Sequence, residues 1–155
     1  MLPAFFIRFR GLGKLYAGLF APLLEKWGLT QTEADILLFL ANNPEYDTAR
    51  DMAEKRHLAK SHISAGIETL AGRGLLERSL REGNRKTIHL RLTAAADPIV
   101  EEGRALQRRY GELIFRDFTQ EEICQLSRWL DRVTENVDAA LEANRNGPQP
   151  EETSG

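Results

Sequence analysis

The chain has 155 residues, of which 42% are hydrophobic and 28% are charged, a balance typical of one globular protein with its own core. It contains no uninterrupted apolar run long enough to span a membrane. Arg8, Arg10 and Lys14 interrupt the apolar N-terminal segment, so we expect neither a membrane span nor a signal peptide. The single cysteine, Cys124, cannot form an internal disulfide, and we therefore expect a cytoplasmic protein.

The net charge of −2 hides an uneven distribution of charged side chains. Residues 48–93 contain ten basic and five acidic side chains, whereas residues 94–155 contain seven basic and thirteen acidic ones. Because phosphate is neutralised locally, a basic central block can bind nucleic acid even when the whole chain is slightly acidic. The alternative is a solvated charged face, and composition alone does not separate the two.

The first predicted element is a long helix. Large apolar side chains recur every three or four residues from Phe5 to Trp27, which is the spacing of one helical stripe. Pro22 lies inside this segment and is expected to kink or restart the helix, because its ring displaces the carbonyl of the preceding turn and it has no amide donor.

Three shorter helices follow. Two begin with a capping box, in which a threonine is followed three residues later by an acidic side chain. In the third helix Ile63, Ile67 and Leu70 share one face, which leaves polar residues on the opposite side. These helices are predicted over residues 30–41, 48–58 and 60–72.

The hydrophobic period then changes to two, which predicts a β-hairpin. Ile88, Leu90 and Leu92 alternate with polar residues, as in a half-buried strand. Residues 75–80 supply the antiparallel partner, and the polar segment 81–86 is predicted to form the connecting loop.

Two helices and a tail complete the chain. One helix is predicted to begin at residues 96–98 and to run to Ile114, with Pro98 in its first turn. The other begins with a capping box at Thr119 and continues to Leu141. The residues from 144 to 155 are rich in Pro, Gly and Glu without periodicity, so we expect a disordered tail.

The predicted fold class is mainly α with a small β-hairpin, and the order of elements is that of a winged helix-turn-helix. The sequence resembles the MarR family of transcriptional regulators. The similarity lies in the segments LTQTEADILLFLANN, DMAEKRHLAKSHISAGIETLAGRGLLER and EGNRKTIHLRLTAAA. The resemblance implies one chain over residues 1–143, with a DNA-binding lobe at 29–95 and dimerisation helices at 1–28 and 96–143. It further implies a homodimer, in which the acidic C-terminal helices associate and do not contact DNA.

The sequence departs from the family pattern at several positions. Asn84 stands where similar proteins usually have an aspartate that pairs with an arginine. Ala65 and Gly66 stand where relatives often have an arginine and an aliphatic residue, and Ala59 is a poor helix cap. We therefore expect a leaner DNA-reading surface.

The predicted DNA-binding residues lie on the third short helix and in the hairpin. An α-helix fits the major groove, where short polar side chains reach base edges and cations contact phosphates. Arg85 occupies the position of the wing arginine in the family, and arginine is favoured in narrow minor grooves. The predicted set is Lys60, Ser61, His62, Ser64, Arg81, Arg85 and Lys86. Hydrated surface side chains are the alternative interpretation.

The N-terminal aromatic stripe has two interpretations. It consists of Phe5, Phe9, Tyr16, Phe20 and Trp27. It can form dimer core, or it can line a cleft for a small aromatic effector, as the resemblance implies. Such a ligand would act by favouring one spacing of the two recognition helices. The candidate ligand-binding residues are Tyr16, Phe20 and Trp27.

We predict no enzymatic activity and no cofactor, because the sequence lacks a nucleophile elbow, a phosphate-binding glycine loop and a metalloprotease motif. A metal sensor built from histidines and Cys124, or a redox sensor based on Cys124, remains an alternative. So does a winged helix that binds other proteins instead of DNA. The histidines are His57, His62 and His89.

Overall fold

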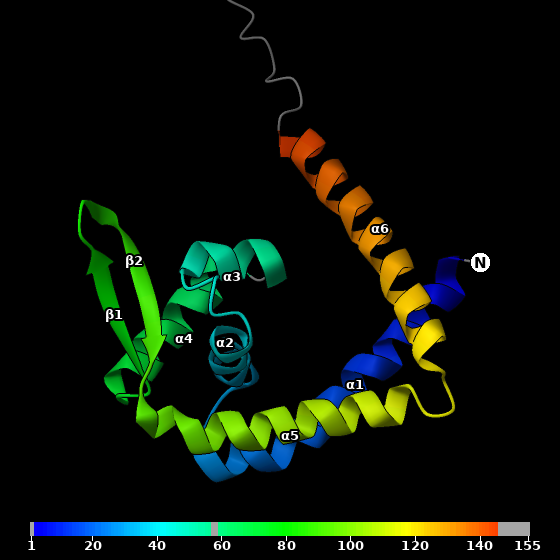
Figure 1. The fold of residues 1–155 in the computed structure, drawn as a ribbon, viewed down its shortest axis with the longest axis horizontal. Coiled ribbons are helices and arrows are strands. Elements are labelled where there is room, and N and C mark those ends of the chain that lie inside the picture. Colours follow the sequence, from blue (N-terminus) through cyan, green and yellow to red (C-terminus); the bar gives the residue numbers. More distant parts are fainter. Residues whose placement is uncertain (1, 57–58, 146–155) are drawn as a thin grey trace, which may run out of the picture. The chain divides into compact units, whose positions relative to one another are not determined.

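The computed structural model describes residues 2–56 and 59–145. The chain divides into two compact units, residues 1–114 and residues 115–155, and each is described by itself. Figure 1 shows the course of the chain. The elements of the first unit are α1 (Leu2–Trp27), α2 (Gln31–Asn42), α3 (Ala49–Arg56), α4 (Lys60–Gly72), β1 (Leu76–Arg81), β2 (Asn84–Leu92), a 3₁₀ turn (Ala94–Ala96) and α5 (Asp97–Ile114). The second unit contains α6 (Gln120–Arg145).

The predicted fold class is confirmed, since the described chain is mainly helical with one antiparallel hairpin. The capping boxes form as expected. The Oγ1 of Thr30 accepts from the amide of Glu33 at 3.2 Å, and Glu33 Oε2 accepts from the amide of Thr30 at 2.9 Å. The amide of Asp51 donates to Thr48 Oγ1 at 3.1 Å in the same way. These bonds satisfy amides that a helix leaves without partners at its start. The end predicted for α3, at His57 and Leu58, lies outside the described residues.

Helix α1 is continuous through Pro22, so of the two expected effects, a kink or a restart, the restart is wrong. Proline removes one helical hydrogen bond, yet packing of a buried face can hold the helix together. Phe20 and Leu23, on either side of the proline, are buried in the core. Helix α5 lies along α1 in Figure 1 and packs against it.

Helix α2 is the centre of the first unit. Its apolar residues from Ile36 to Leu40 are all buried, and it packs against α1, α4 and α5. Two glycines allow close approach of the neighbouring helices. A Cβ on Gly66 of α4 would lie 2.6 Å from Ile36 Cδ1, and one on Gly103 of α5 would lie 2.8 Å from Leu38 Cδ2. Gly66 is therefore a packing residue that faces the core and not the solvent.

The hairpin differs from the prediction in two respects. The strands extend further than expected, so the connection is the two-residue turn Glu82–Gly83 and not the segment 81–86. The register also shifts between Leu80 and Arg81, which places an irregularity at the tip of β2. The predicted burial of Ile88 is wrong, because it pairs with Leu80 beyond the core and both side chains are more than half exposed.

The second unit consists mainly of α6. Its capping box forms as predicted, because the amide of Thr119 donates to Glu122 Oε2 at 2.8 Å and the amide of Glu122 donates to Thr119 Oγ1 at 3.2 Å. Helix α6 continues through Arg145, so the first two residues of the predicted tail are helical and the rest lies outside the described residues. None of the helix's residues is buried. Its exposed apolar side chains include Trp129, Leu130, Val133, Val137 and Leu141.

Across the described ranges, 2–56 and 59–145, no helix combines the length and the apolar composition needed to cross a membrane.

Candidate nucleic-acid interface

Helix α4 separates its predicted contact residues from the core. Ile63, Gly66, Ile67 and Leu70 are buried against the other helices, since they recur at the three- and four-residue spacing of one helical face. The predicted contact residues lie near the start of the helix and all have exposed side chains. They are Lys60, Ser61, His62 and Ser64.

The N-cap residue of α4 supplies no side-chain hydrogen bond to the helix. Ala59 occupies the N-cap with extended dihedrals and makes no side-chain cap hydrogen bond, as its methyl side chain requires. Its carbonyl accepts from the amides of His62 and Ile63 at 3.0 and 3.2 Å. The positive end of the helix dipole lies at this end of α4, beside Lys60.

The tip of the hairpin carries two cations, Arg85 and Lys86. Arg85 and Lys86 are exposed, and neither has an ion-pair partner within residues 2–56 and 59–145. Asn84 holds the backbone of this segment, because its Oδ1 accepts from the amides of Lys86 and Thr87 at 3.0 and 3.3 Å. Asn84, which stands at the family's aspartate position, thus acts as a hydrogen-bonding residue within the hairpin itself.

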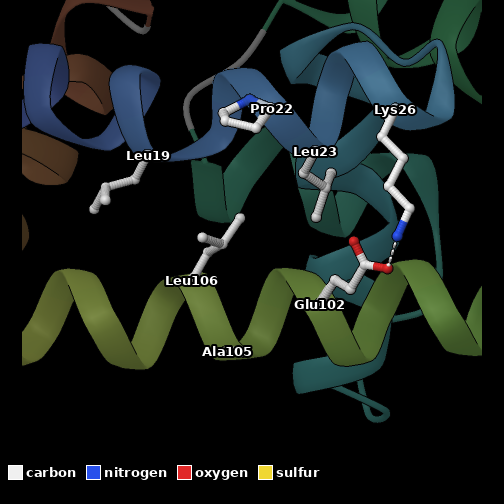
Figure 2. A pocket seen from close by; sticks show the side chains of 7 residues that line it. All are labelled: Leu19, Pro22, Leu23, Lys26, Glu102, Ala105 and Leu106. Atoms are coloured by element: carbon white, nitrogen blue, oxygen red, sulfur yellow. Dashed lines mark hydrogen bonds and ion pairs between the residues drawn. The ribbon is translucent and has the colours of Figure 1, made fainter.

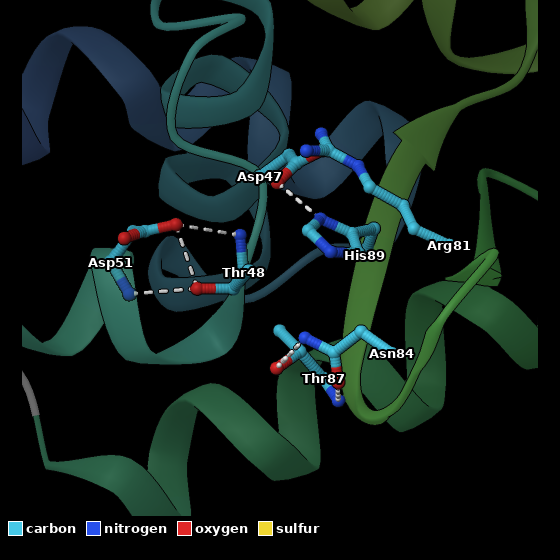
Figure 3. A network of polar contacts seen from close by, with 7 residues as sticks. All are labelled: Asp47, Thr48, Asp51, Arg81, Asn84, Thr87 and His89. Atoms are coloured by element: carbon cyan, nitrogen blue, oxygen red, sulfur yellow. Dashed lines mark hydrogen bonds and ion pairs between the residues drawn. The ribbon is translucent and has the colours of Figure 1, made fainter.

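Arg81, the third predicted cation of the hairpin, is already paired. Figure 3 shows its guanidinium beside Asp47, with Nη2 3.0 Å from Oδ2. The other carboxylate oxygen lies 2.7 Å from Nδ1 of His89. Burial alone would raise the pKa of Asp47, but the hydrogen bond with His89 and the electrostatic influence of His89 and Arg81 outweigh it and lower the pKa. This carboxylate therefore fastens the hairpin to the segment before α3.

Asp47 also holds the hairpin through its backbone, since its carbonyl accepts from the amide of Leu90 at 2.8 Å. The sequence analysis did not identify this residue as important. Its partners lie 34 and 42 positions away in the chain, and no local pattern connects residues at such separations. The structure therefore adds Asp47 and His89 as residues that hold Arg81 and strand β2 in place.

The three candidate ligand-binding residues all lie on α1 but differ in exposure. Phe20 is fully buried and stacks on Tyr16, with ring centroids 4.4 Å apart. Tyr16 also meets Tyr110 edge to face at 5.2 Å, and burial raises its pKa. Trp27 is half-buried, and its Nε1 donates to Glu102 Oε2 at 3.4 Å. The assignment of these residues to an effector site stays a prediction.

A cavity of about 360 Å³ lies between α1 and α5, as Figure 2 shows. It is mainly apolar, and Lys26 and Glu102 form an ion pair at one side. The hydrogen bond from Lys26 holds the pKa of Glu102 below its ordinary value. None of the three candidate ligand-binding residues lines the cavity. The lining residues are Leu19, Pro22, Leu23, Lys26, Glu102, Ala105 and Leu106.

The residues considered for metal or redox sensing are dispersed. His62 is exposed on α4, whereas His89 pairs with Asp47. Cys124 is exposed in α6, and His57 lies outside the described residues. In the part of the chain that the structure describes, no three His, Cys, Asp or Glu side chains form a metal-binding group.

Comparison with known proteins shows which family and which solved structures this chain resembles. Residues 27–86 match the sequence profile of the MarR family. The sequence has no match among curated proteins. A MarR-family regulator from Listeria monocytogenes, complexed with 26mer DNA, is 17% identical with a TM-score of 0.79, and 96% of each chain is covered.

Two further solved structures have the same fold. A MarR-family regulator from Silicibacter pomeroyi is 18% identical, with a TM-score of 0.72 and coverage of 86% of this chain and 89% of its own. A variant of MepR from S. aureus, bound to an oligodeoxyribonucleotide, is 17% identical, with a TM-score of 0.55 and coverage of 86% and 97%. Residues 27–86 of this chain are therefore similar to the MarR family, and the chain has the winged helix-turn-helix fold of these solved structures.

Proposed function

We propose that this protein is a sequence-specific DNA-binding transcriptional regulator of the cytoplasm. The observation that carries the proposal is the pair of exposed polar surfaces on one lobe. Helix α4 presents Lys60, Ser61 and His62 at its uncapped start, and the adjacent hairpin presents Arg85 and Lys86 without ion-pair partners in the described ranges. Helix α4 suits the major groove, and the hairpin cations suit the neighbouring minor groove or its phosphates.

The roles within this surface follow from side-chain chemistry. The hydroxyls of Ser61 and Ser64 and the imidazole of His62 can exchange hydrogen bonds with base edges. Lys60 and Lys86 bind phosphate as point charges. Arg85 is the residue best suited to a narrow minor groove. Arg81 contributes less, because Asp47 already neutralises its charge.

Two similar structures support the proposal, since the relatives from Listeria monocytogenes and S. aureus were determined with DNA. A homodimer would place two copies of α4 in successive major grooves of a pseudo-palindromic operator. The exposed apolar side chains of α6 favour such a dimer, because a monomer leaves them in water. Bound across an operator, the dimer would act as a repressor by blocking transcription.

The response to a small aromatic effector is the part of the proposal that rests on family resemblance. Tyr16, Phe20 and Trp27 are its candidate residues. An effector can change DNA binding only if it binds one conformation of the dimer more tightly than the other. We expect an effective ligand to change operator affinity, and the same ligand to bind less well to a Tyr16→Ala variant whose thermal unfolding midpoint is unchanged.

The decisive test is a salt titration of duplex DNA binding by the full chain and by the double variant Arg85→Ala, Lys86→Ala. For each phosphate that the variant no longer neutralises, the slope of log K against log salt concentration should become shallower by about 0.9. The matched control is Arg108→Ala, Arg109→Ala, which removes two exposed cations from α5 of the same unit. Analytical ultracentrifugation of all three proteins should show the same oligomeric state.

An unchanged affinity and slope for the hairpin variant would exclude its contacts with DNA. Selection of bound sequences from random duplexes would then show whether a pseudo-palindromic operator exists and how far apart its half-sites lie. A protein that binds no duplex at low salt would contradict the proposal and would favour a protein-interaction module instead.

A further inference from the structure

Helices α1 and α4 end in the same way. Each is followed by a glycine in the left-handed region, Gly28 at φ 59° and Gly74 at φ 70°. In both cases the amide of the next leucine donates to the carbonyl five residues back, at 3.0 Å from Leu29 to Leu24 and at 3.0 Å from Leu75 to Leu70. This ending turns the chain sharply and leaves some carbonyls of the last turn without a donor from their own helix.

The side chain of Arg73 supplies donors to two carbonyls at the end of α1. Its Nη2 donates to the carbonyl of Trp27 at 2.7 Å and its Nη1 to the carbonyl of Gly28 at 3.0 Å. Arg73 is also the C-cap residue of α4. The planar guanidinium can bond both carbonyls at once, and its charge complements the negative end of the helix dipole.

A second arginine makes a similar connection at the end of α2. Arg104 of α5 donates from Nη2 to the carbonyl of Ala41 at 2.5 Å and from Nε to Asn42 Oδ1 at 2.9 Å. The side-chain Nδ2 of Asn42 in turn donates to Gln107 Oε1 at 3.0 Å. The winged-helix lobe is thus tied to the α1 and α5 pair at two helix ends, and of the two arginines only Arg73 extends directly from α4.

We propose that Arg73 is a positioning residue that fixes the direction of α4 relative to α1 and thereby sets the operator spacing that the dimer accepts. This inference rests on the proposed function. If α1 contributes to the dimer interface, a rotation of the lobe about the end of α1 changes the distance between the two copies of α4. Arg73 itself need not contact DNA, because its guanidinium is directed to backbone carbonyls of the same chain.

The test measures affinity for a series of duplexes in which two copies of the selected half-site are moved apart or together one base pair at a time. The proteins are the full chain, Arg73→Gln, Arg73→Lys and the control Arg109→Gln. Arg109 donates to Glu112 of its own helix, so the control removes the same charge from a position that does not join two helices. Affinity for a duplex with one half-site and the thermal unfolding midpoint are measured in parallel.

The wild-type protein should favour one spacing, and Arg73→Gln should reduce that preference about fivefold or more, in the range of a typical coupling between sites. Arg73→Lys, which keeps the charge but lacks the planar fork, should fall between the two. Single half-site affinity should stay at the wild-type value, and Arg109→Gln should keep the wild-type profile. Arg73→Lys provides the test if the glutamine variant unfolds.

Two outcomes would overturn the inference and leave the proposed function intact. In the first, both Arg73 variants keep the wild-type spacing profile. In the second, they lose affinity equally at every spacing and for the single half-site, which indicates a direct DNA contact. A wild-type protein that binds none of the duplexes would instead contradict the proposed function and the inference with it.

Discussion

Gly66 is the residue at which α4 comes closest to α2. The nearest atom to a Cβ at this position would be Ile36 Cδ1, at 2.6 Å, and Ile36 is itself almost fully buried. Overpacking of a buried contact forces neighbouring side chains out of their preferred rotamers. The glycine therefore determines how closely α4 lies against α2.

We expect Gly66→Val to lower the free energy of unfolding by about 1 to 3 kcal/mol. The control is Gly72→Val at the end of the same helix, where a Cβ meets nothing within 4 Å, and we expect a change within about 0.5 kcal/mol there. Urea denaturation of both variants measures the difference. Equal stability of the two variants would show that Ile36 moves aside without cost.

The sequence alone predicted which residues α4 exposes, but it did not predict which residues fix the position of α4, and the reason is physical. The exposure of Ser61 and Ser64 followed from helical periodicity, which is a local property. The packing role of Gly66 did not, because the low helix propensity of glycine is visible in the sequence whereas the approach of Ile36 is not. The role of Arg73 likewise depends on carbonyls that are 45 and 46 positions away.

Among the elements, the hairpin depends most on a single residue outside it. Asp47 binds Arg81 and His89 through its carboxylate and Leu90 through its carbonyl. Because the pKa of Asp47 is lowered in the folded protein, the carboxylate's contribution to stability is fully present at pH values above the pKa that Asp47 has in the unfolded chain. That contribution is lost as the pH falls through the folded-state pKa.

We expect Asp47→Asn to destabilise the protein at pH 7 by about 1 to 3 kcal/mol, the cost of weakening a charged hydrogen-bond group. The difference from wild type should shrink toward zero as the pH falls through the lowered pKa of Asp47. Urea denaturation across a pH series provides the measurement, with the exposed residue Glu101 changed to Gln as the control. A difference that does not vary with pH would contradict the electrostatic explanation.

Element boundaries show where local signals suffice. The capping boxes at Thr30, Thr48 and Thr119 located helix starts because each involves a side chain and an amide three residues apart. The turn of the hairpin was placed wrongly, since the polar composition of residues 81–86 is compatible with a loop as well as with exposed strand ends. Strand pairing decided between them.

At the scale of the whole molecule, the exposed apolar side chains of α6 bear on the proposed homodimer. Leu130, Val133, Val137 and Leu141 recur every three or four residues and are each at least 40% exposed. This spacing forms one stripe along the helix. We expect the stripe to be covered in the homodimer.

We expect Val133→Asp to weaken dimerisation at least about tenfold, because loss of one buried valine costs roughly 1.5 kcal/mol or more and 1.4 kcal/mol is a factor of ten. The matched control is Ala139→Asp, which adds the same carboxylate to the opposite side of α6. Sedimentation velocity at micromolar concentration gives the oligomeric state. A wild-type protein that is monomeric under these conditions, or a Val133→Asp variant that dimerises normally, would contradict an interface through this stripe.

The chain's two tryptophans provide one optical probe in each unit. Trp27 is half-buried beside Lys26 and Glu102, at the helix end that Arg73 holds, whereas Trp129 is 56% exposed on α6. The tryptophan emission of a Trp27→Phe protein therefore comes from α6 alone. It should shift to shorter wavelength as the protein concentration rises, because dimerisation would remove the Trp129 indole from water. In a Trp129→Phe protein the emission comes from Trp27, at the junction of α1 and α4. The same two variants thus separate assembly of the dimer from movement of the lobe, without an added label.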